Sequence, residues 1–166
     1  MDRKRAGGGL TQGEGEARLR PMKWLDLPPI WLLFFVCLAA LSRSLWTASL
    51  WPLDLLGLPL LLAGLAITLW SAAHMVRRKT TVIPHMEPEK LVTDGPFNWS
   101  RNPIYLSDLM MLAGLSLMLD APLGLLLVPV FYVILTRRFI EPEEARLSAA
   151  FGASFDAYKM STGRWL

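Results

Sequence analysis

Residues able to recognise a small polar molecule gather in one stretch of this sequence. Gly95-Pro96 forces a turn. Asn102 followed by Pro103 predicts a helix start, with Asn102 as the N-cap and Pro103 at the first helical position. Arg101 then stands just before the helix and Tyr105 on its first turn. The stretch therefore presents a cation, an amide and a hydroxyl together.

A second stretch supplies carboxylates. Pro142 suits the start of another helix, and Glu143 and Glu144 suit the positive end of its dipole. Simple helix capping also explains these two glutamates, and both interpretations stay open. Asp108 follows Tyr105 by three residues and shares its helix face. Because a carboxylate is costly inside a membrane, Asp108 either faces a polar cavity or lies hydrated at the interface.

Other kinds of chemistry find no support in the sequence. His74 and His85 lack a His or Cys partner at ligand spacing, so we expect no bound metal. The sequence has no Ser-His-Asp arrangement, no Gly-x-Ser-x-Gly motif and no Walker loop. The one cysteine, Cys37, lies in an apolar run, which excludes a disulfide scaffold.

Membrane helices are the elements predicted to position these residues. Of the 166 residues, 53% are hydrophobic and 19% charged, which excludes a disordered chain. Four nearly uncharged segments are the candidate spans: Ile30–Leu50, Leu55–Trp70 (extending to about Met75), Ile104–Leu119 and Ala121–Leu135. A helix needs about 20 residues to cross a 30 Å hydrocarbon core, so the last two are short.

The short third and fourth segments are separated by the turn signal Asp120-Ala121-Pro122, which predicts a tight helical hairpin. A soluble four-helix bundle is the alternative to a membrane protein. Each helix of such a bundle should show a polar stripe, which the second and fourth segments lack.

The basic residues predict the orientation in the membrane. All Lys and Arg residues except Arg43 fall in the tail, in the segment Arg77–Arg101 or after Leu135. The positive-inside rule makes that side cytoplasmic, so both termini and the candidate site are expected there. The basic excess therefore indicates a membrane protein and not one that binds nucleic acid.

The predicted organisation is a flexible basic tail over residues 1–22 and a single membrane-embedded domain over residues 23–166. The apolar run begins too late for a signal peptide, so we expect a retained first helix. After the fourth span, large hydrophobic residues recur at helical spacing: Leu147, Phe151, Phe155 and Tyr158. They predict an amphipathic C-terminal helix on the cytoplasmic surface. The predicted fold is an all-α integral membrane protein with four transmembrane helices and this additional helix.

One signature of membrane-embedded methyltransferases resembles the run Leu91-Val92-Thr93-Asp94-Gly95-Pro96-Phe97-Asn98-Trp99-Ser100-Arg101-Asn102-Pro103-Ile104-Tyr105. These enzymes are the isoprenylcysteine carboxyl methyltransferase and phospholipid N-methyltransferase group. A second signature of the group is similar to Glu143-Glu144-Ala145-Arg146-Leu147, followed by Phe151-Gly152, Phe155, Tyr158 and Arg164-Trp165. The resemblance covers about residues 55–166.

The resemblance implies that S-adenosylmethionine is the methyl donor, bound at the cytoplasmic face by a helical site. The donor's amino group would bind Glu143 or Glu144, and its carboxylate would bind Arg101 and the following helix start. Arg101, Tyr105 and Glu144 would be the catalytic residues. The full set implied at the donor is Leu91, Val92, Thr93, Gly95, Pro96, Phe97, Arg101, Asn102, Tyr105, Glu143 and Glu144.

The implied acceptor is a lipophilic molecule that enters sideways from the lipid bilayer. Asp108, Arg137 and Arg138 would contact it, although positive-inside anchoring explains the two arginines equally. Asn102 and Lys90 stand where the carboxyl methyltransferases often have His, which disfavours a prenylcysteine. A phospholipid amine, an isoprenoid carboxylate or thiol, and a small lipophilic thiol or amine stay open, as does the oligomeric state.

Two other functions remain as alternatives. Membrane sterol reductases have a similar helical core and bind NADPH there, but they favour different residues before Pro-x-Tyr. A non-catalytic membrane scaffold could keep the fold, although a decayed site need not retain its polar residues. Binding of S-adenosylhomocysteine or of NADPH would separate the two enzyme classes.

Overall fold

A computed structural model describes residues 26–78 and 90–166, and every regular element in these residues is helical. The elements are α1 (Pro28–Ser42), α2 (Gly57–Arg77), α3 (Pro103–Met118), α4 (Pro122–Ile134), α5 (Glu141–Phe151) and α6 (Ala153–Ser161). Short 3-10 turns, Leu53–Leu56 and Gly95–Asn98, precede α2 and α3. The all-helical prediction is confirmed for these residues. The predicted tail and His85 lie outside them.

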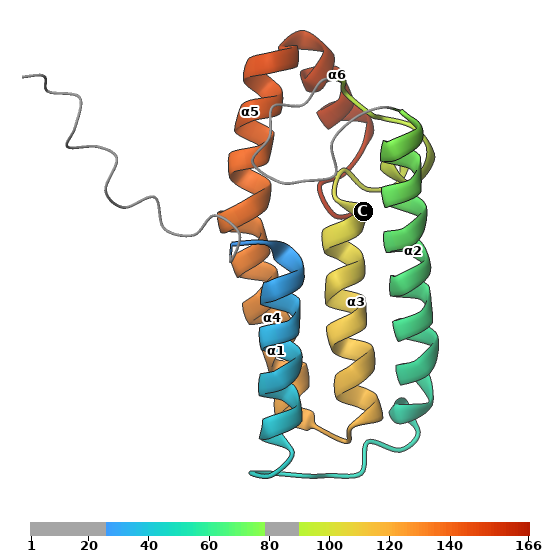
Figure 1. Cartoon of the computed structure of the whole chain (residues 1–166), viewed down its shortest axis with the longest axis vertical. Coiled ribbons are helices and arrows are strands. Elements are labelled where there is room, and N and C mark those ends of the chain that lie inside the picture. Colours follow the sequence, from blue (N-terminus) through green and yellow to red (C-terminus); the bar gives the residue numbers. More distant parts are fainter. Residues whose placement is uncertain (1–25, 79–89) are drawn as a thin grey trace, which may run out of the picture.

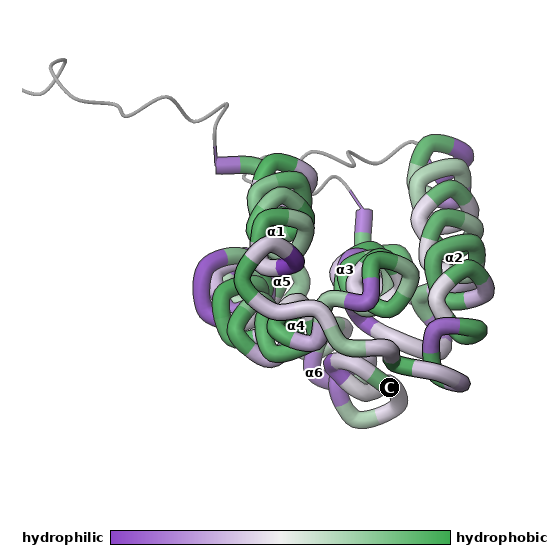
Figure 2. The backbone as a smooth tube through the Cα atoms, turned by 90° about the horizontal axis from the view of Figure 1, so that it is seen from below, coloured by the Kyte–Doolittle hydropathy of each residue, from purple (hydrophilic) through white to green (hydrophobic). Residues whose placement is uncertain are grey.

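Helix α3 is the centre of the bundle. It packs against α1, α2 and α4 (Figures 1 and 2). Half of its residues are buried, among them Tyr105, Asp108 and Leu112. The hydrophobic core joins it to α1, α4 and the segment after α4 through Phe35, Ala39, Tyr105, Leu112, Phe131, Leu135, Phe139 and Ile140.

Small residues bring α2 and α3 unusually close together. A Cβ on Gly114 would lie 2.6 Å from the carbonyl oxygen of Gly57, and one on Gly64 would lie 2.9 Å from that of Ser107. The hydroxyls of Thr68 and Ser107 are 2.5 Å apart across the same interface. Such contacts between small residues are how helices associate in lipid, where hydrophobicity supplies no drive.

The outer helices expose large hydrophobic side chains. Leu33, Leu62 and Leu126 are 62%, 54% and 63% exposed on α1, α2 and α4. Figure 2 shows hydrophobic residues on the outward as well as the inward sides of α1 and α2. Two helical stretches, Leu53–Arg77 and Pro122–Phe151, are long and apolar enough to cross a membrane. Helices α1 and α3 are apolar but shorter, with 15 and 16 residues.

The first predicted span is too long. The sequence predicts a helix over Ile30–Leu50, but α1 ends at Ser42. The hydroxyls of Ser42 and Ser44 donate to the carbonyls of Ala39 and Leu41, both at 2.7 Å. These local bonds compete with continued helix formation and end the element there. The predicted hairpin turn is confirmed, since Asp120 and Ala121 lie between α3 and α4.

Pro142 does not start a helix, contrary to the prediction. Helix α4 continues through a π-helical segment, Leu135–Ile140, directly into α5. In that segment the N–H of Glu141 bonds to the carbonyl of Thr136, five residues back. Proline breaks a regular α-helix because it lacks an N–H and crowds the carbonyl four residues earlier. The wider π turn immediately before Pro142 allows the helix to continue.

The predicted C-terminal amphipathic helix is divided in two. Gly152 separates α5 from α6 and has φ +48°, a conformation that favours glycine. On α6, Phe155 and Tyr158 are buried. The chain thus folds back over the end of the bundle that holds the predicted site (Figure 1).

Candidate functional site

The two predicted polar groups meet at one end of the bundle. The start of α3 carries Arg101 and Tyr105, and α5 carries Glu143 and Glu144. Arg101 Nη2 lies 2.9 Å from Glu144 Oε1. The hydroxyl of Tyr105 donates to Glu143 Oε2 at 3.1 Å. Two side-chain bonds thus join α3 and its approach to α5.

The carboxylate of Glu144 lies between two guanidinium groups. Besides Arg101, it accepts bonds from Arg164 Nη2 at 2.6 Å and Nε at 3.2 Å. The Arg101 and Glu144 side chains are only 11% and 14% exposed. The bond to Glu144 raises the pKa of Arg164 above its usual value, so its guanidinium stays charged. Among the described residues, the buried donor Arg101 Nε has no partner, and a buried donor is normally paired with an acceptor.

The last residues of the chain complete this end of the bundle. The N–H of Arg101 donates to the carbonyl of Gly163 at 3.0 Å. Asn102 Nδ2 donates to the carbonyl of Arg164 at 2.9 Å. The ring of Trp165 lies 4.7 Å from that of Tyr132. The segment after α6 is therefore fixed to both α3 and α4.

Asn102 differs from its prediction in one respect. It occupies the N-cap position of α3, with Pro103 as the first helical residue, but its side chain makes no capping bond. The amide instead holds the carbonyl of Arg164. The N–H of Asn102 donates to Ser100 Oγ at 3.0 Å. The N-cap residue thus links the helix start to the C-terminal segment.

The Gly-Pro turn is fastened to α2 and α6. Gly95 has φ +61°, and a Cβ there would lie 2.8 Å from the ring of His74. His74 Nε2 lies 2.9 Å from Asp94 Oδ1, and Arg78 bonds to the other oxygen of Asp94. Pro96 is buried. His74 therefore orders this turn.

Tyr158 holds the same turn from α6. Its hydroxyl donates to the carbonyl of Phe97 at 2.5 Å. Burial raises the pKa of Tyr158 to about 12, and the charge of Arg101 offsets this only partly. The phenol therefore stays protonated and donates its hydrogen bond over the physiological range.

Asp108 lies buried one turn below Tyr105 on α3. It is 4% exposed, and its Oδ2 has no hydrogen-bond partner within residues 26–78 and 90–166. This burial argues against the interpretation as a hydrated interfacial carboxylate. A buried carboxylate oxygen without a partner is costly, and such an oxygen can accept a hydrogen bond from a donor or pair with a cation.

Several predicted residues are not joined to this cluster. Arg138 Nε pairs with Asp26 Oδ1 at 2.7 Å, and its guanidinium lies over the Trp31 ring, at the start of α1. Within the described residues, Arg137 is exposed with no ion pair. Leu91, Val92 and Thr93 form an irregular, partly exposed approach to the Gly-Pro turn.

Sequence reasoning missed Arg164 as a site residue. The only signal was the basic-aromatic pair Arg164-Trp165 at the end of the second signature. Nothing in the local sequence says that this segment returns to the start of α3. Within residues 26–78 and 90–166, no three His, Cys, Asp or Glu side chains are placed to hold a metal ion.

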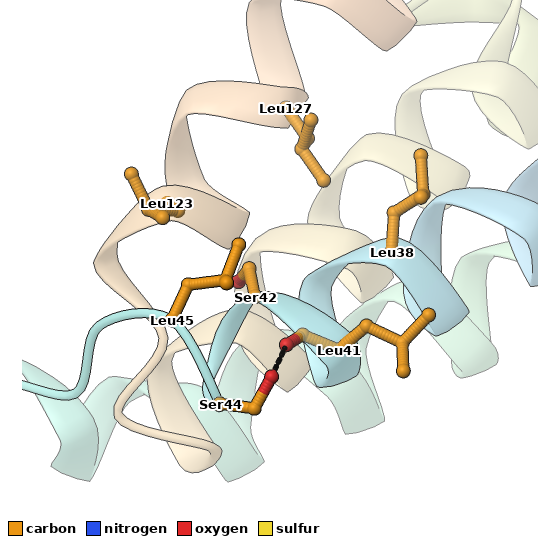
Figure 3. A pocket seen from close by; sticks show the side chains of 7 residues that line it. All are labelled: Leu38, Leu41, Ser42, Ser44, Leu45, Leu123 and Leu127. Carbon is orange, nitrogen blue, oxygen red and sulfur yellow. Dashed lines mark hydrogen bonds between the residues drawn. The ribbon is translucent and has the colours of Figure 1, made fainter.

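An open groove of about 450 Å³ lies at the other end of the bundle (Figure 3). It is lined by Leu38, Leu41, Ser42, Ser44, Leu45, Leu123 and Leu127. These residues come from the end of α1 with the residues after it, and from α4. The groove is almost entirely apolar and holds no charged side chain, so we assign no chemistry to it.

Comparison with known proteins identifies the family of this helical protein. A family model described as phospholipid methyltransferase matches residues 52–154. The chain therefore belongs to the phospholipid methyltransferase family. The match runs from α2 to the start of α6 and includes Arg101, Tyr105, Glu143 and Glu144. Neither the curated proteins nor the solved structures contain a match to the chain.

Proposed function

We propose that this protein transfers a methyl group from S-adenosylmethionine to an amine-bearing lipid at the cytoplasmic face of a membrane. Family membership supports methyltransferase activity on lipophilic substrates. One observation carries the assignment of the site. The family-matched segments bring Arg101 and Tyr105 of one signature against Glu144 and Glu143 of the other.

A four-span membrane arrangement is part of this proposal. The outward-facing leucines of α1, α2 and α4 need an apolar surrounding. At 15 and 16 residues, α1 and α3 are about 23 and 24 Å long, less than a 30 Å hydrocarbon core. Local thinning of the bilayer would accommodate them. The concentration of Lys and Arg at the site's end of the bundle supports a cytoplasmic location for that end.

The residues present fit an amino-acid-bearing donor. Arg101 keeps a buried N–H without a partner, which an oxygen of the donor's carboxylate would satisfy. Tyr105 orients Glu143 through a 3.1 Å hydrogen bond, and Glu143 is the carboxylate that we assign to the donor's ammonium group. When bound, the donor supplies a sulfonium methyl group that an incoming nucleophile attacks in line.

Asp108 is assigned to the acceptor. Its partnerless oxygen is buried on α3, one turn below Tyr105. An acceptor that enters between the helices from the bilayer would meet it there. A carboxylate there would bind an ammonium headgroup and take the proton that the amine must lose before it can attack. An anionic acceptor would be repelled. This favours an amine over a carboxylate or thiolate among the acceptors that the sequence left open.

Labelled methyl transfer tests the function. Detergent-purified protein would be incubated with methyl-labelled S-adenosylmethionine and, in separate reactions, with phosphatidylethanolamine or a prenylated cysteine. We expect label in the amine lipid. Label only in the prenylated cysteine, or in neither, would contradict the proposed acceptor. Arg101→Ala serves as the variant with a disabled donor site.

A further inference from the structure

Arg101 and Arg164 both bind the carboxylate of Glu144. Glu144 uses one oxygen for Arg101, at 2.9 Å, and both oxygens for Arg164, at 2.6 and 3.2 Å. Three of the roughly four acceptor positions of its carboxylate are therefore used by the protein's own guanidiniums. A ligand's ammonium group would compete there with two guanidiniums.

The charge of the cluster points to an anionic ligand. Two guanidiniums and one carboxylate carry a net charge of about +1. Glu141 lies on the outer side of Arg164 at 4.0 Å, but it is more than half exposed and is screened by solvent. The buried Nε of Arg101 still has a hydrogen to donate. Beside these two guanidiniums an anion would find both positive charge and an unused donor.

Arg164 is held in place by its own backbone. The carbonyls of Gly163 and Arg164 accept bonds from Arg101 and Asn102, and Trp165 packs against Tyr132. The guanidinium is thus pre-positioned, which lowers the entropic cost of binding. Arg164 lies beyond the part of the chain that the family model matches, so this role rests on the contacts of Arg164 in the structure.

We propose that Arg101 and Arg164 together form one anion-binding site, and that Glu144 positions both guanidiniums instead of binding the ligand itself. The anion is a carboxylate or a phosphate. This inference rests on the proposed function, in which the source is either the carboxylate of the methyl donor or the phosphate of a phospholipid acceptor.

Calorimetry with two donors tests the proposal on the full chain in detergent. S-adenosylmethionine carries a carboxylate and an ammonium group, and decarboxylated S-adenosylmethionine carries only the ammonium group. The wild type should bind the first more tightly. Arg164→Ala should weaken S-adenosylmethionine binding roughly 10- to 100-fold and leave the decarboxylated donor unchanged. Arg164→Lys should lie between, because lysine keeps the charge but loses the bidentate geometry.

Glu144→Gln distinguishes a positioning role from direct contact with the donor. We expect it to reduce affinity for S-adenosylmethionine and to spare the decarboxylated donor. Loss of affinity for both donors in Glu144→Gln would mean that Glu144 binds the ammonium, and would overturn the proposal. Lys159→Ala is the matched control. It removes a positive charge at the same end of the bundle, on α6, where Lys159 pairs with Asp156.

Kinetic measurements with two lipid acceptors, one with and one without a phosphate, identify the source of the anion. If Arg164→Ala leaves both donor affinities unchanged but raises the KM for phosphatidylethanolamine and not for a phosphate-free lipid amine, the anion is the headgroup phosphate. Equal weakening of both donors, tighter donor binding, or no change in any of these values would overturn the proposal. Absence of any donor binding by the wild type would instead contradict the proposed function.

Discussion

Arg101 and Glu144 face each other across the end of the helical bundle, with Arg101 Nη2 2.9 Å from Glu144 Oε1. The pair joins the approach to α3 with α5, and Arg164 completes it from the C-terminal segment. Because the two arginines share the one carboxylate of Glu144, the three side chains are not equivalent. Loss of Glu144 leaves two positive charges facing each other, whereas loss of either arginine leaves Glu144 with the other.

This asymmetry predicts that Glu144→Gln lowers the stability of the protein more than Arg101→Ala does. Glu144→Gln should destabilise the protein by about 3 kcal/mol, since it removes the counter-charge of two partly buried guanidiniums. Arg101→Ala should cost about 1–2 kcal/mol, because Arg164 still neutralises Glu144. Unfolding of the two variants and the wild type in the same detergent would measure the difference. Equal or reversed effects would show that the three charges do not act as one cluster.

Asp108→Asn should impair binding of the lipid acceptor without lowering the stability of the protein. Its buried carboxylate oxygen has no partner, so a neutral amide should leave stability unchanged or raise it by about 1 kcal/mol. We expect the KM for the lipid amine to rise at least tenfold, because the ion pair with the ammonium headgroup is lost. Steady-state kinetics and thermal unfolding would measure the two effects.

Donor affinity is the internal control for Asp108→Asn and should not change. Leu112→Ala, one turn further along α3 in the core, should lose about 2–5 kcal/mol of stability. A loss of stability in Asp108→Asn comparable to that in Leu112→Ala would show that Asp108 is a structural residue.

The glycines between α2 and α3 set how closely these helices pack. In Gly114→Ala the new Cβ would lie 2.6 Å from the carbonyl oxygen of Gly57 and 2.8 Å from the backbone nitrogen of Leu61. Backbone atoms cannot turn aside, so the helices must separate, and we expect a loss of about 1–3 kcal/mol. Leu62→Ala, on the outward face of α2, should change little. Equal stability of the Gly114→Ala variant and the wild type would contradict the close approach.

Tyr158 predicts a pH effect on stability in the alkaline range. Burial raises its pKa from the ordinary 10.0 to about 12. Between these values the folded protein binds more protons than the unfolded chain, so this contribution to stability is constant below pH 10 and falls as the pH rises towards 12. Denaturation at several pH values should show the decline in the wild type and a shallower one in Tyr158→Phe. Identical slopes would contradict the buried phenol.

The existence of most helices can be predicted from the sequence, but the residues at which some of them begin and end cannot. The two signatures, the hairpin turn at Asp120 and the start of α3 at Pro103 follow from local residue chemistry. Local chemistry also misled. Pro142 is typical of a helix start, yet a π turn before it allows one helix to run from Pro122 to Phe151. Phe139 and Ile140 of the π turn pack into the hydrophobic core, and this tertiary packing stabilises the turn. No local sequence pattern encodes that packing.

The residues of the candidate site also divide into those that local sequence identifies and one that depends on tertiary contacts. The sequence identified Arg101, Tyr105, Glu143 and Glu144, and the structure places them in two bonded pairs. It did not identify Arg164, because its role depends on α6 folding back at Gly152 and on the carbonyl of Arg164 meeting Asn102. Contacts between distant segments of this kind follow from the fold and not from residue spacing.

Donor binding is the most direct test of the central claim that this site holds S-adenosylmethionine. The full chain, purified in detergent, would be titrated with S-adenosylmethionine, S-adenosylhomocysteine and NADPH in a calorimeter, with Arg101→Ala beside the wild type. We predict micromolar binding of both adenosyl ligands to the wild type, at least tenfold weaker binding to Arg101→Ala, and no binding of NADPH. Binding of NADPH without the adenosyl ligands, or no binding by folded wild-type protein, would contradict it.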